Sequence, residues 1–430
     1  MAELDKVQFA DRTQLLQACI HCGLCLEQCP TYLVSGEEMS SPRGRIHLMK
    51  AVEDGSIDPQ DEIFQKHEAS CLVCRSCETA CPSGVQFGVL MEQTREIINE
   101  QTKPHWFRKF IYTKLIGSRS IAVMMQFMLL LFSKARFVRL LTETFDLKKS
   151  PLKRFAASLE LLPENVPFPS KRLLIYRTQQ ARRGSVGMLI GCIGDQFSSS
   201  VNDATINVLN RLGYDVHTIP QISCCGALAS HSGFGDHARE LALSAISAIE
   251  SADIEYFITN IAGCGAMMKD YEKLFSGTPD LSRAQRVRGK MRDISEFLLE
   301  FHHDDIRNLN IRFEEKTSIG YHAPCHLYHG QQITDAPREL LSLIKNAEVF
   351  ALEENTICCG SAGTYNIEHP EMADALLDRK MEIIKTQNPN VVATANAGCL
   401  MQLQKGLRQQ NSEVKVRHAI EILQESMSRK

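Results

Sequence analysis

The chain has 430 residues, of which 44% are hydrophobic and 23% are charged, and its formal net charge is −3. This composition is typical of a globular protein of two or three domains, and the charge gives no general case for nucleic-acid binding. The start is polar and lacks the apolar core of a signal peptide, and the longest apolar stretch, Ile121 to Phe132, is too short to cross a bilayer. A cytoplasmic protein is therefore expected, in which sixteen cysteines fit metal ligands better than disulfides.

Two cysteine runs near the N-terminus repeat one pattern, C-x2-C-x2-C-x3-C-P. The first run is Cys19, Cys22, Cys25 and Cys29, and the second run is Cys71, Cys74, Cys77 and Cys81. This spacing is that of bacterial two-cluster ferredoxins. Zinc sites normally present two C-x2-C pairs instead. The two intact runs therefore predict two [4Fe–4S] clusters and an electron-transfer role.

The same pattern predicts how the two runs share their ligands. In two-cluster ferredoxins three closely spaced cysteines surround one cluster, and the fourth ligates the other cluster. We therefore expect cluster 1 to be held by Cys19, Cys22, Cys25 and Cys81, and cluster 2 by Cys71, Cys74, Cys77 and Cys29. Helix-like segments at Gly44 to Val52, Asp61 to Glu68 and Phe87 to Gln101 indicate a helical two-cluster domain over residues 1–101.

A basic segment follows the two runs. From Gln101 to Arg183 the chain has 17 Lys and Arg against 4 Asp and Glu, a balance of +13. Within it, Trp106 to Leu141 mixes basic and apolar residues at roughly helical spacing. Such a helix would dock on an acidic partner, cover the acidic remainder of this chain, or lie on an anionic membrane. We assign residues 102–183 to a basic helical linker, with a boundary in the proline-rich stretch from Pro151 to Pro169.

The remaining eight cysteines form an internal repeat. One set is Cys192, Cys224, Cys225 and Cys264, and the other is Cys325, Cys358, Cys359 and Cys399. In each set the adjacent pair belongs to a Cys-Cys-Gly triplet, and matched positions are 133, 134 and 135 residues apart. A repeat of this kind indicates a duplicated pair of lobes, which we place at residues 184–312 and 313–430.

Each lobe alternates strand-like and helix-like segments, which favours an α/β lobe with a parallel sheet. The expected strands are Gly187 to Ile190, Tyr256 to Thr259, Val349 to Leu352 and Val391 to Ala395, and the expected helices include Ala204 to Leu212, Ala238 to Ile249 and Pro370 to Ile384. The cysteines lie at strand ends or in the following turns, where open α/β sheets bind ligands. We therefore expect four cysteines to converge in each lobe on a metal or cluster, the alternative being buried structural cysteine.

The motifs resemble a known family. The repeated C…CCG…C pattern resembles the cysteine-rich CCG domain of heterodisulfide reductases and related proteins. Behind two ferredoxin motifs it resembles the iron–sulfur subunit of glycolate oxidase, and the iron–sulfur subunit of the anaerobic glycerol-3-phosphate dehydrogenase is a more distant relative. The strings that carry this likeness are HCGLC ending at Cys25, Ser41 to Arg45, Cys77 to Val85 and Cys358 to Tyr365.

One departure from the fuller CCG pattern bears on metal content. That pattern ends in C-x2-C, and here its first cysteine is replaced by Ile261 in one lobe and by Asn396 in the other. A lobe with four thiolates could hold a cubane, a modified cluster or zinc. The histidines around Cys325, which are His322, His326 and His329, could be ligands, neighbouring donors or proton carriers, and ordinary structural histidine is the alternative.

The resemblance implies an α+β multidomain protein, with an N-terminal helical ferredoxin domain followed by two pseudo-repeated α/β CCG lobes. It implies the iron–sulfur electron-transfer subunit of a multi-subunit glycolate dehydrogenase, which passes electrons from FAD on a partner flavoprotein towards a quinone, with peripheral contact at the cytoplasmic face of the inner membrane. Because the chain has no GxGxxG motif, we expect no flavin and no catalysis by this chain alone. The alternatives are a D-lactate or glycerol-3-phosphate dehydrogenase subunit, a heterodisulfide-reductase-like thiol enzyme, and a redox sensor.

Overall fold

The computed structural model describes residues 12–115, 118, 121, 123–124, 160–161, 172–192 and 194–428. Its N-terminal part is helical in the described residues. The elements are α1 (Arg12–Gln17), α2 (Pro30–Ser35), η1 (Glu38–Ser40), α3 (Pro42–Glu53), α4 (Glu62–Ala69), α5 (Ser76–Thr79), α6 (Phe87–Thr102), α7 (Trp106–Phe110) and η2 (Ile111–Leu115). The three helices that the sequence predicts here are confirmed, each within two residues at either end.

Local chemistry explains where α3 and α4 begin. The side chain of Ser41 caps α3 by accepting a hydrogen bond from the backbone N–H of Gly44, and Asp61 caps α4 in the same way. A Cβ on Gly44 would lie 2.0 Å from the backbone oxygen of Glu38, so only glycine fits where α3 crosses the preceding turn. The start of α3 is thus fixed against the chain that leaves the first cysteine run.

The first α/β lobe contains a five-stranded sheet in the order β1-β3-β2-β4-β5, in which β1 alone is antiparallel to its neighbour. Its elements are β1 (Ile175–Tyr176), β2 (Gly184–Met188), α11 (Gly194–Phe197), α12 (Ser199–Arg211), β3 (Tyr214–Thr218), α13 (Ala227–His231), α14 (Gly235–Glu250), β4 (Tyr256–Thr259), α15 (Ala262–Lys269), α16 (Tyr271–Leu274), α17 (Leu281–Lys290), β5 (Met291–Asp293) and α18 (Ile294–Asn308).

The second lobe contains a four-stranded parallel sheet in the order β7-β6-β8-β9. Its elements are β6 (Arg312–Tyr321), η4 (His326–Gly330), α19 (Ala336–Ser342), β7 (Lys345–Ala351), α20 (Tyr365–Glu368), α21 (Pro370–Gln387), β8 (Val391–Thr394), α22 (Ala397–Gln409), β9 (Lys415–His418) and α23 (Ala419–Ser428). When β1 is left out, the two sheets have the same strand order. Counted along the chain within each lobe, the second strand comes first in the sheet and is followed by the first, third and fourth strands. The chain combines helical and parallel-sheet parts, as the sequence predicts.

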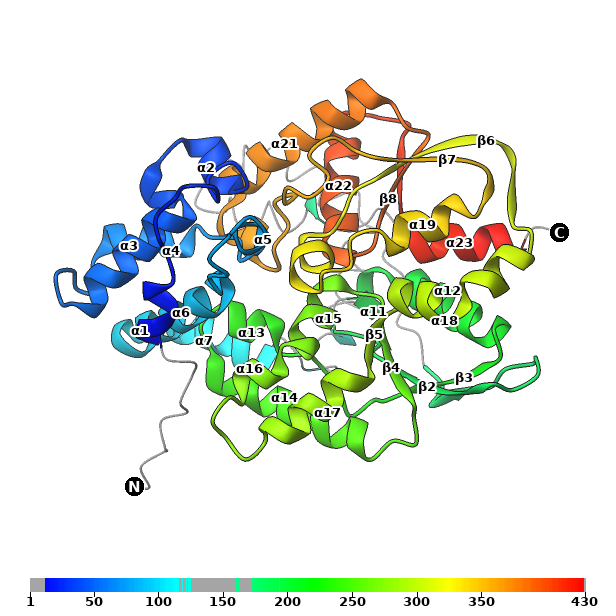
Figure 1. Ribbon diagram of the computed structural model, residues 1–430, viewed down its shortest axis with the longest axis horizontal. Coiled ribbons are helices and arrows are strands. Elements are labelled where there is room, and N and C mark those ends of the chain that lie inside the picture. Colours follow the sequence, from blue (N-terminus) through cyan, green and yellow to red (C-terminus); the bar gives the residue numbers. More distant parts are fainter. Residues whose placement is uncertain are drawn as a thin grey trace.

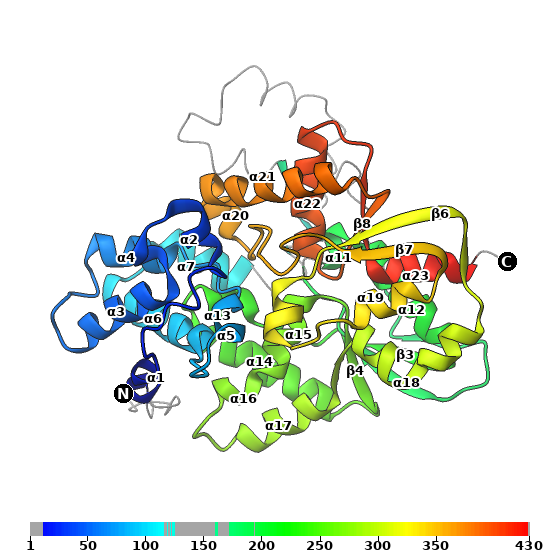
Figure 2. The ribbon, with the colours of Figure 1, turned by 45° about the horizontal axis from the view of Figure 1, so that its top comes forward.

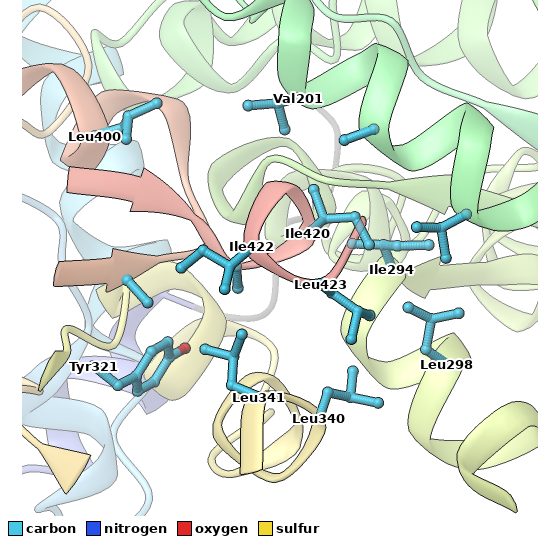
Figure 3. Packing of buried hydrophobic residues seen from close by; sticks show 14 of the residues in the cluster. Val201, Ile294, Leu298, Tyr321, Leu340, Leu341, Leu400, Ile420, Ile422 and Leu423 are labelled. Atoms are coloured by element: carbon cyan, nitrogen blue, oxygen red, sulfur yellow. The ribbon is translucent and has the colours of Figure 1, made fainter. Parts of the chain in front are cut away.

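The two lobes share one hydrophobic core. Helix α12 packs on α23, and α18 packs on α19. Figure 3 shows Val201 and Leu298 of the first lobe near Leu340, Ile420 and Leu423 of the second, and all five side chains are buried. Since apolar area on each lobe is removed from water only when the other is present, the lobes stabilise each other.

The N-terminal helices pack against both lobes. Helix α2 contacts α21 of the second lobe, while α6 contacts α13 and α14 of the first, and Figures 1 and 2 show this blue part beside the two. The contacts include polar ones, because Arg75 pairs with Asp270 at 2.6 Å and the hydroxyl of Tyr365 donates to the carbonyl of Ser70 at 2.9 Å. The second cysteine run therefore lies where the helical part meets both lobes.

Most of the predicted basic helix from Trp106 to Leu141 lies outside the described residues. Its described start consists of α7 and η2, and it exposes large apolar side chains at Trp106, Phe107 and Phe110. Within the described part of the chain, no helix has the length and apolar character that crossing a membrane requires. The boundary between linker and first lobe stays a prediction.

Candidate metal centres

The second cysteine run forms a buried group of thiols. Cys71, Cys74 and Cys77 are all buried, and Cys29 of the first run is buried with them. Burial raises the pKa of Cys77 well above its ordinary value, and the negative charges of Cys74, Cys71 and Cys29 raise it further. Thiols that disfavour one another's ionisation in this way gain most from a shared cation, which replaces their protons. The donor set fits a thiolate-held cluster.

The first run lies closer to the surface. Cys22 is exposed and Cys19 and Cys25 are half-buried. Cys81, from the end of the second run, packs against the same apolar cluster as Cys19 and Cys25. Burial and the charges of Cys19 and Cys29 raise the pKa of Cys25 to about 11. The same apolar cluster also contains Cys71 and Cys77, so it does not assign Cys81 to either site, and the crossed assignment of ligands stays a prediction.

Both loops share an unusual backbone. His21 and Gly23 in the first run have positive φ angles of 56° and 87°, and the matching residues Val73 and Arg75 in the second have 51° and 64°. Positive φ is costly for a branched residue such as Val73, so the surrounding contacts must hold it there. One result is that the backbone N–H of Val73 points at the Sγ of Cys71, 3.4 Å away. The second loop therefore presents a backbone N–H group to a cysteine sulfur.

The second lobe brings its four thiols to one place. Cys358 is in hydrogen-bonding contact with Cys325 and Cys359, and Cys359 with Cys399. These contacts shift the pKa values of the four thiols in opposite directions. Contact with Cys358 lowers the pKa of Cys325 and the pKa of Cys359. Contact with Cys325 raises the pKa of Cys358, and contact with Cys359 raises the pKa of Cys399. All four are buried. Packed thiols that share protons in this way are suited to metal ligation.

Histidines surround this site in different roles. The donor atoms of His322, Cys359 and Cys399 all lie within 4.8 Å of one another, so His322 can act as a ligand. The Nδ1 of His326 lies 3.5 Å from the Sγ of Cys325. His329 instead contacts Thr79 and the carbonyl of Thr356 through its two ring nitrogens, which is a structural arrangement.

The first lobe also gathers its cysteines, in more apolar surroundings. The Sγ atoms of Cys192 and Cys224 are 3.8 Å apart, and Cys225 is in hydrogen-bonding contact with Cys224 and Cys264. By the repeat offsets, Leu189 and Ile261 occupy the positions of His322 and Asn396 in the second lobe. Asn396 approaches the Sγ of Cys399 with its amide nitrogen at 3.6 Å, which an isoleucine cannot do.

The second run is in direct contact with the second lobe. Leu72 and Cys74 form one buried cluster with Cys325, Cys358 and Tyr365. Burial raises the pKa of Cys74 well above its ordinary value, and the next largest cause is the charge of Cys325. Two groups of thiols that are far apart in the sequence are thus neighbours.

Three groups beside these sites were missed by sequence reasoning. Arg45 and Glu68 are fully buried next to the second run, and Tyr365 joins that run to the second lobe. The segment from Ser41 to Arg45 was part of the family likeness, but its pattern alone does not say which of its two arginines is buried.

Comparisons with known proteins agree with this organisation. A 4Fe-4S dicluster domain matches residues 15–85, and a cysteine-rich domain, CCG, matches residues 186–269 and 319–404. The chain is 35% identical to the probable glycolate oxidase iron-sulfur subunit of Bacillus subtilis over 430 residues, covering 98% of this chain and 96% of the relative. It is 31% identical to the glycolate oxidase iron-sulfur subunit of Escherichia coli, covering 96% and 95%. Lactate utilization protein A of Anoxybacillus flavithermus is 30% identical over 56% of this chain and 98% of that protein. The chain therefore belongs to the family of glycolate oxidase iron–sulfur subunits.

Proposed function

We propose that this chain is the electron-transfer subunit of a multi-subunit glycolate dehydrogenase and that it is not catalytic alone. The observation that supports this best is the arrangement of its thiol sites. The first run exposes Cys22 at the surface, Cys71, Cys74 and Cys77 of the second run are buried, and Cys74 neighbours Cys325 of the second lobe. Three sites arranged from the surface inwards are suited to carry electrons rather than to bind a hydroxy acid.

We propose the crossed ligand sets for the two N-terminal clusters. Cluster 1 takes Cys19, Cys22, Cys25 and Cys81, and cluster 2 takes Cys71, Cys74, Cys77 and Cys29. Clusters of this type accept and release single electrons, whereas a 2-hydroxy acid is oxidised by loss of a hydride. The hydride therefore goes to FAD on a partner flavoprotein, and the exposed loop around Cys22 receives electrons from it.

We further propose that the CCG lobes are a duplicated pair and that each binds a metal or cluster. The supporting features are the equal strand order and the contacts among the four thiols within each lobe. The second lobe adds His322 to its donors, so zinc or a cluster with a nitrogen ligand suits it. In the first lobe, the side chains that contact one another at the matching place are the four cysteines. Four thiol ligands suit a cubane cluster.

The substrate is glycolate in this proposal, with D-lactate as the second candidate. Two nearly full-length relatives are named as glycolate oxidase subunits, while the lactate utilization proteins match little more than half of this chain. Glycerol-3-phosphate and a heterodisulfide-reductase-like activity stay weaker alternatives. We place the complex at the cytoplasmic face of the membrane, where electrons would pass to a quinone.

Anaerobic purification of the chain, alone and with its flavoprotein partner, tests the function. The chain alone should contain at least about eight irons with matching sulfide, and it should accept electrons from the reduced flavoprotein. It should not oxidise glycolate or D-lactate without that partner. Steady-state oxidation of either acid by this single polypeptide, without added flavin, would contradict the proposal. Thiol production from a mixed disulfide would favour the heterodisulfide-reductase-like activity.

A further inference from the structure

The side chain of Arg45 is buried beside the second cysteine run. It is 1% exposed and is among the largest fully buried side chains of the described residues. A guanidinium group keeps its charge at every physiological pH. A buried charge of this kind is very unfavourable unless an opposite charge lies close to it. The surroundings of Arg45 therefore have to contain an anion.

Protein groups that hydrogen-bond to Arg45 do not supply that anion. Its Nε donates to the carbonyl of His67 at 2.8 Å, and one terminal nitrogen donates to the hydroxyls of Ser70 at 2.8 Å and Thr31 at 3.2 Å. All three acceptors are neutral. Over the described ranges, no carboxylate lies within ion-pair distance of this guanidinium.

Glu68 is the nearby acid that could have been the partner. Its side chain is fully buried, and neither carboxyl oxygen has a hydrogen-bond partner among the described residues. Burial raises its pKa to about 8, although Arg45 is the first of the charges that oppose this rise. Among the described residues neither oxygen lies within ion-pair distance of Arg45, so Glu68 is not its partner.

The remaining negative groups are the cysteines themselves. Burial disfavours the charged form of Arg45, yet its pKa is raised overall, and Cys71 and Cys29 are the first causes of that rise. These two cysteines belong to different runs, and both are proposed ligands of cluster 2. A [4Fe–4S] cluster with four thiolates is itself an anion, and it gains one further negative charge on reduction.

We propose that Arg45 is the buried counter-ion of cluster 2 and a positioning residue that raises the reduction potential of that cluster. This inference rests on the proposed function, which assigns cluster 2 to Cys71, Cys74, Cys77 and Cys29. A fixed positive charge stabilises the reduced state more than the oxidised state, because the reduced state carries more negative charge.

Arg45 also joins the two segments that have to meet at cluster 2. Its donor to Thr31 reaches the first run, because the hydroxyl of Thr31 lies 3.2 Å from the Sγ of Cys29. Its donor to Ser70 reaches the second run, because Ser70 directly precedes Cys71. One terminal nitrogen of the guanidinium thus connects two cysteines that are far apart in the sequence.

Arg43 provides a contrast on the same helix. It lies two residues before Arg45, its side chain is 33% exposed, and it pairs with Glu38 at 2.6 Å. Its charge is therefore neutralised by a carboxylate and screened by water. The site near the first run has no equivalent buried cation in the described residues. We therefore expect the reduction potential of cluster 2 to be higher than that of cluster 1. Electrons would then pass from cluster 1, near the surface, to cluster 2 in the interior.

Redox titration of the full chain, followed by low-temperature EPR, tests the proposal. The variants are Arg45→Met, which removes the charge at similar length, and Arg45→Lys, which keeps it. Arg43→Met is the matched control. Cluster 2 is identified by repeating the titration in a Cys22→Ala background, in which only the first run loses a ligand.

Arg45→Met should lower the potential of cluster 2, Arg45→Lys should keep it close to the original, and Arg43→Met should leave it unchanged. If Arg45→Met fails to hold cluster 2 while Arg45→Lys holds it, the need for the charge is still supported. An unchanged potential in Arg45→Met, or loss of cluster 2 in Arg45→Lys as well, would overturn the proposal. Absence of any [4Fe–4S] signal from the unmodified chain would instead count against the proposed function.

Discussion

Replacing Glu68 by glutamine should stabilise this protein near neutral pH. The substitution keeps the shape of the side chain and removes its ability to ionise. Glu68 is fully buried on α4, and both of its carboxyl oxygens lack hydrogen-bond partners among the described residues. An acid in such a place favours its neutral form, so the folded protein resists the ionisation that the unfolded chain undergoes freely.

The size of the effect follows from the two pKa values. Burial raises the pKa of Glu68 from 4.5 to about 8, against the attraction of Arg45, Arg95 and Arg12. Between these values the folded state keeps a proton that the unfolded state has lost, so stability falls as the pH rises, by about 1.4 kcal/mol per pH unit. The fall begins near pH 4.5 and ends near pH 8. At pH 7 the glutamine variant should therefore be more stable by about 3 kcal/mol.

Differential scanning calorimetry of the full chain and the Glu68→Gln variant, prepared anaerobically and compared at several pH values, measures this difference in stability. At about 2.1 cal/mol/K of unfolding entropy per residue, a chain of 430 residues shifts its melting temperature by about 1 °C per kcal/mol, so the melting temperatures at pH 7 should differ by roughly 3 °C. The difference should shrink steadily towards pH 5. Glu62→Gln is the matched control, because Glu62 lies on the same helix with an exposed side chain, and its effect should stay within about 0.5 kcal/mol.

Two results would refute this reasoning. Parallel pH profiles for the original chain and the Glu68→Gln variant would mean that Glu68 does not titrate in the way described. Destabilisation by Glu68→Gln at pH 7 would mean that Glu68 is ionised in the folded protein.

Three further predictions concern the metal centres and the helix beside them. Cys81→Ser should damage cluster 1 and spare cluster 2, as followed by EPR, and loss of cluster 2 alone would contradict the crossed ligation. Gly44→Ala should cost about 1–3 kcal/mol in thermal unfolding, because its Cβ would meet a backbone oxygen at 2.0 Å, whereas Gly289→Ala, with open space around it, should gain up to about 1 kcal/mol. His322→Ala should weaken metal retention in the second lobe by about 10–100-fold, and an unchanged metal content under chelator challenge would exclude a ligand or supporting role for this histidine.

Sequence reasoning succeeded where the signal is local. Helices α3, α4 and α6 and strands β2, β4, β7 and β8 were predicted because hydrophobic periodicity and capping residues determine them over a few residues. Five strands were not among those expected, namely β1, β3, β5, β6 and β9. For the short edge strands β1, β5 and β9 the reason is that two to four residues carry too little pattern. The contact between Cys74 and Cys325 could not be predicted either, since it depends on how the helical part docks on the lobes.

Arg43 and Arg45 show a second limit of sequence reasoning. Two positions apart on a helix means about 200° around its axis, so the pair must point to opposite faces. Periodicity therefore predicts that one arginine faces the protein and the other faces solvent. It does not predict that the inward face of α3 meets two cysteine loops rather than an apolar core, because the loops come from other parts of the chain.

The two lobes differ in the side chains that lie beside their thiols. The lobe whose Cys325 neighbours Cys74 is the one with His322 and Asn396 beside its thiols, and the other lobe has Leu189 and Ile261 at the matching positions. Polar donors near bound metal stabilise added negative charge, while apolar neighbours do not. Under the proposed function, the site that accepts electrons from cluster 2 gains from the polar set. The asymmetry therefore follows the docking of the ferredoxin part, and reversing it with His322→Leu should make the second lobe harder to reduce without removing its four thiols.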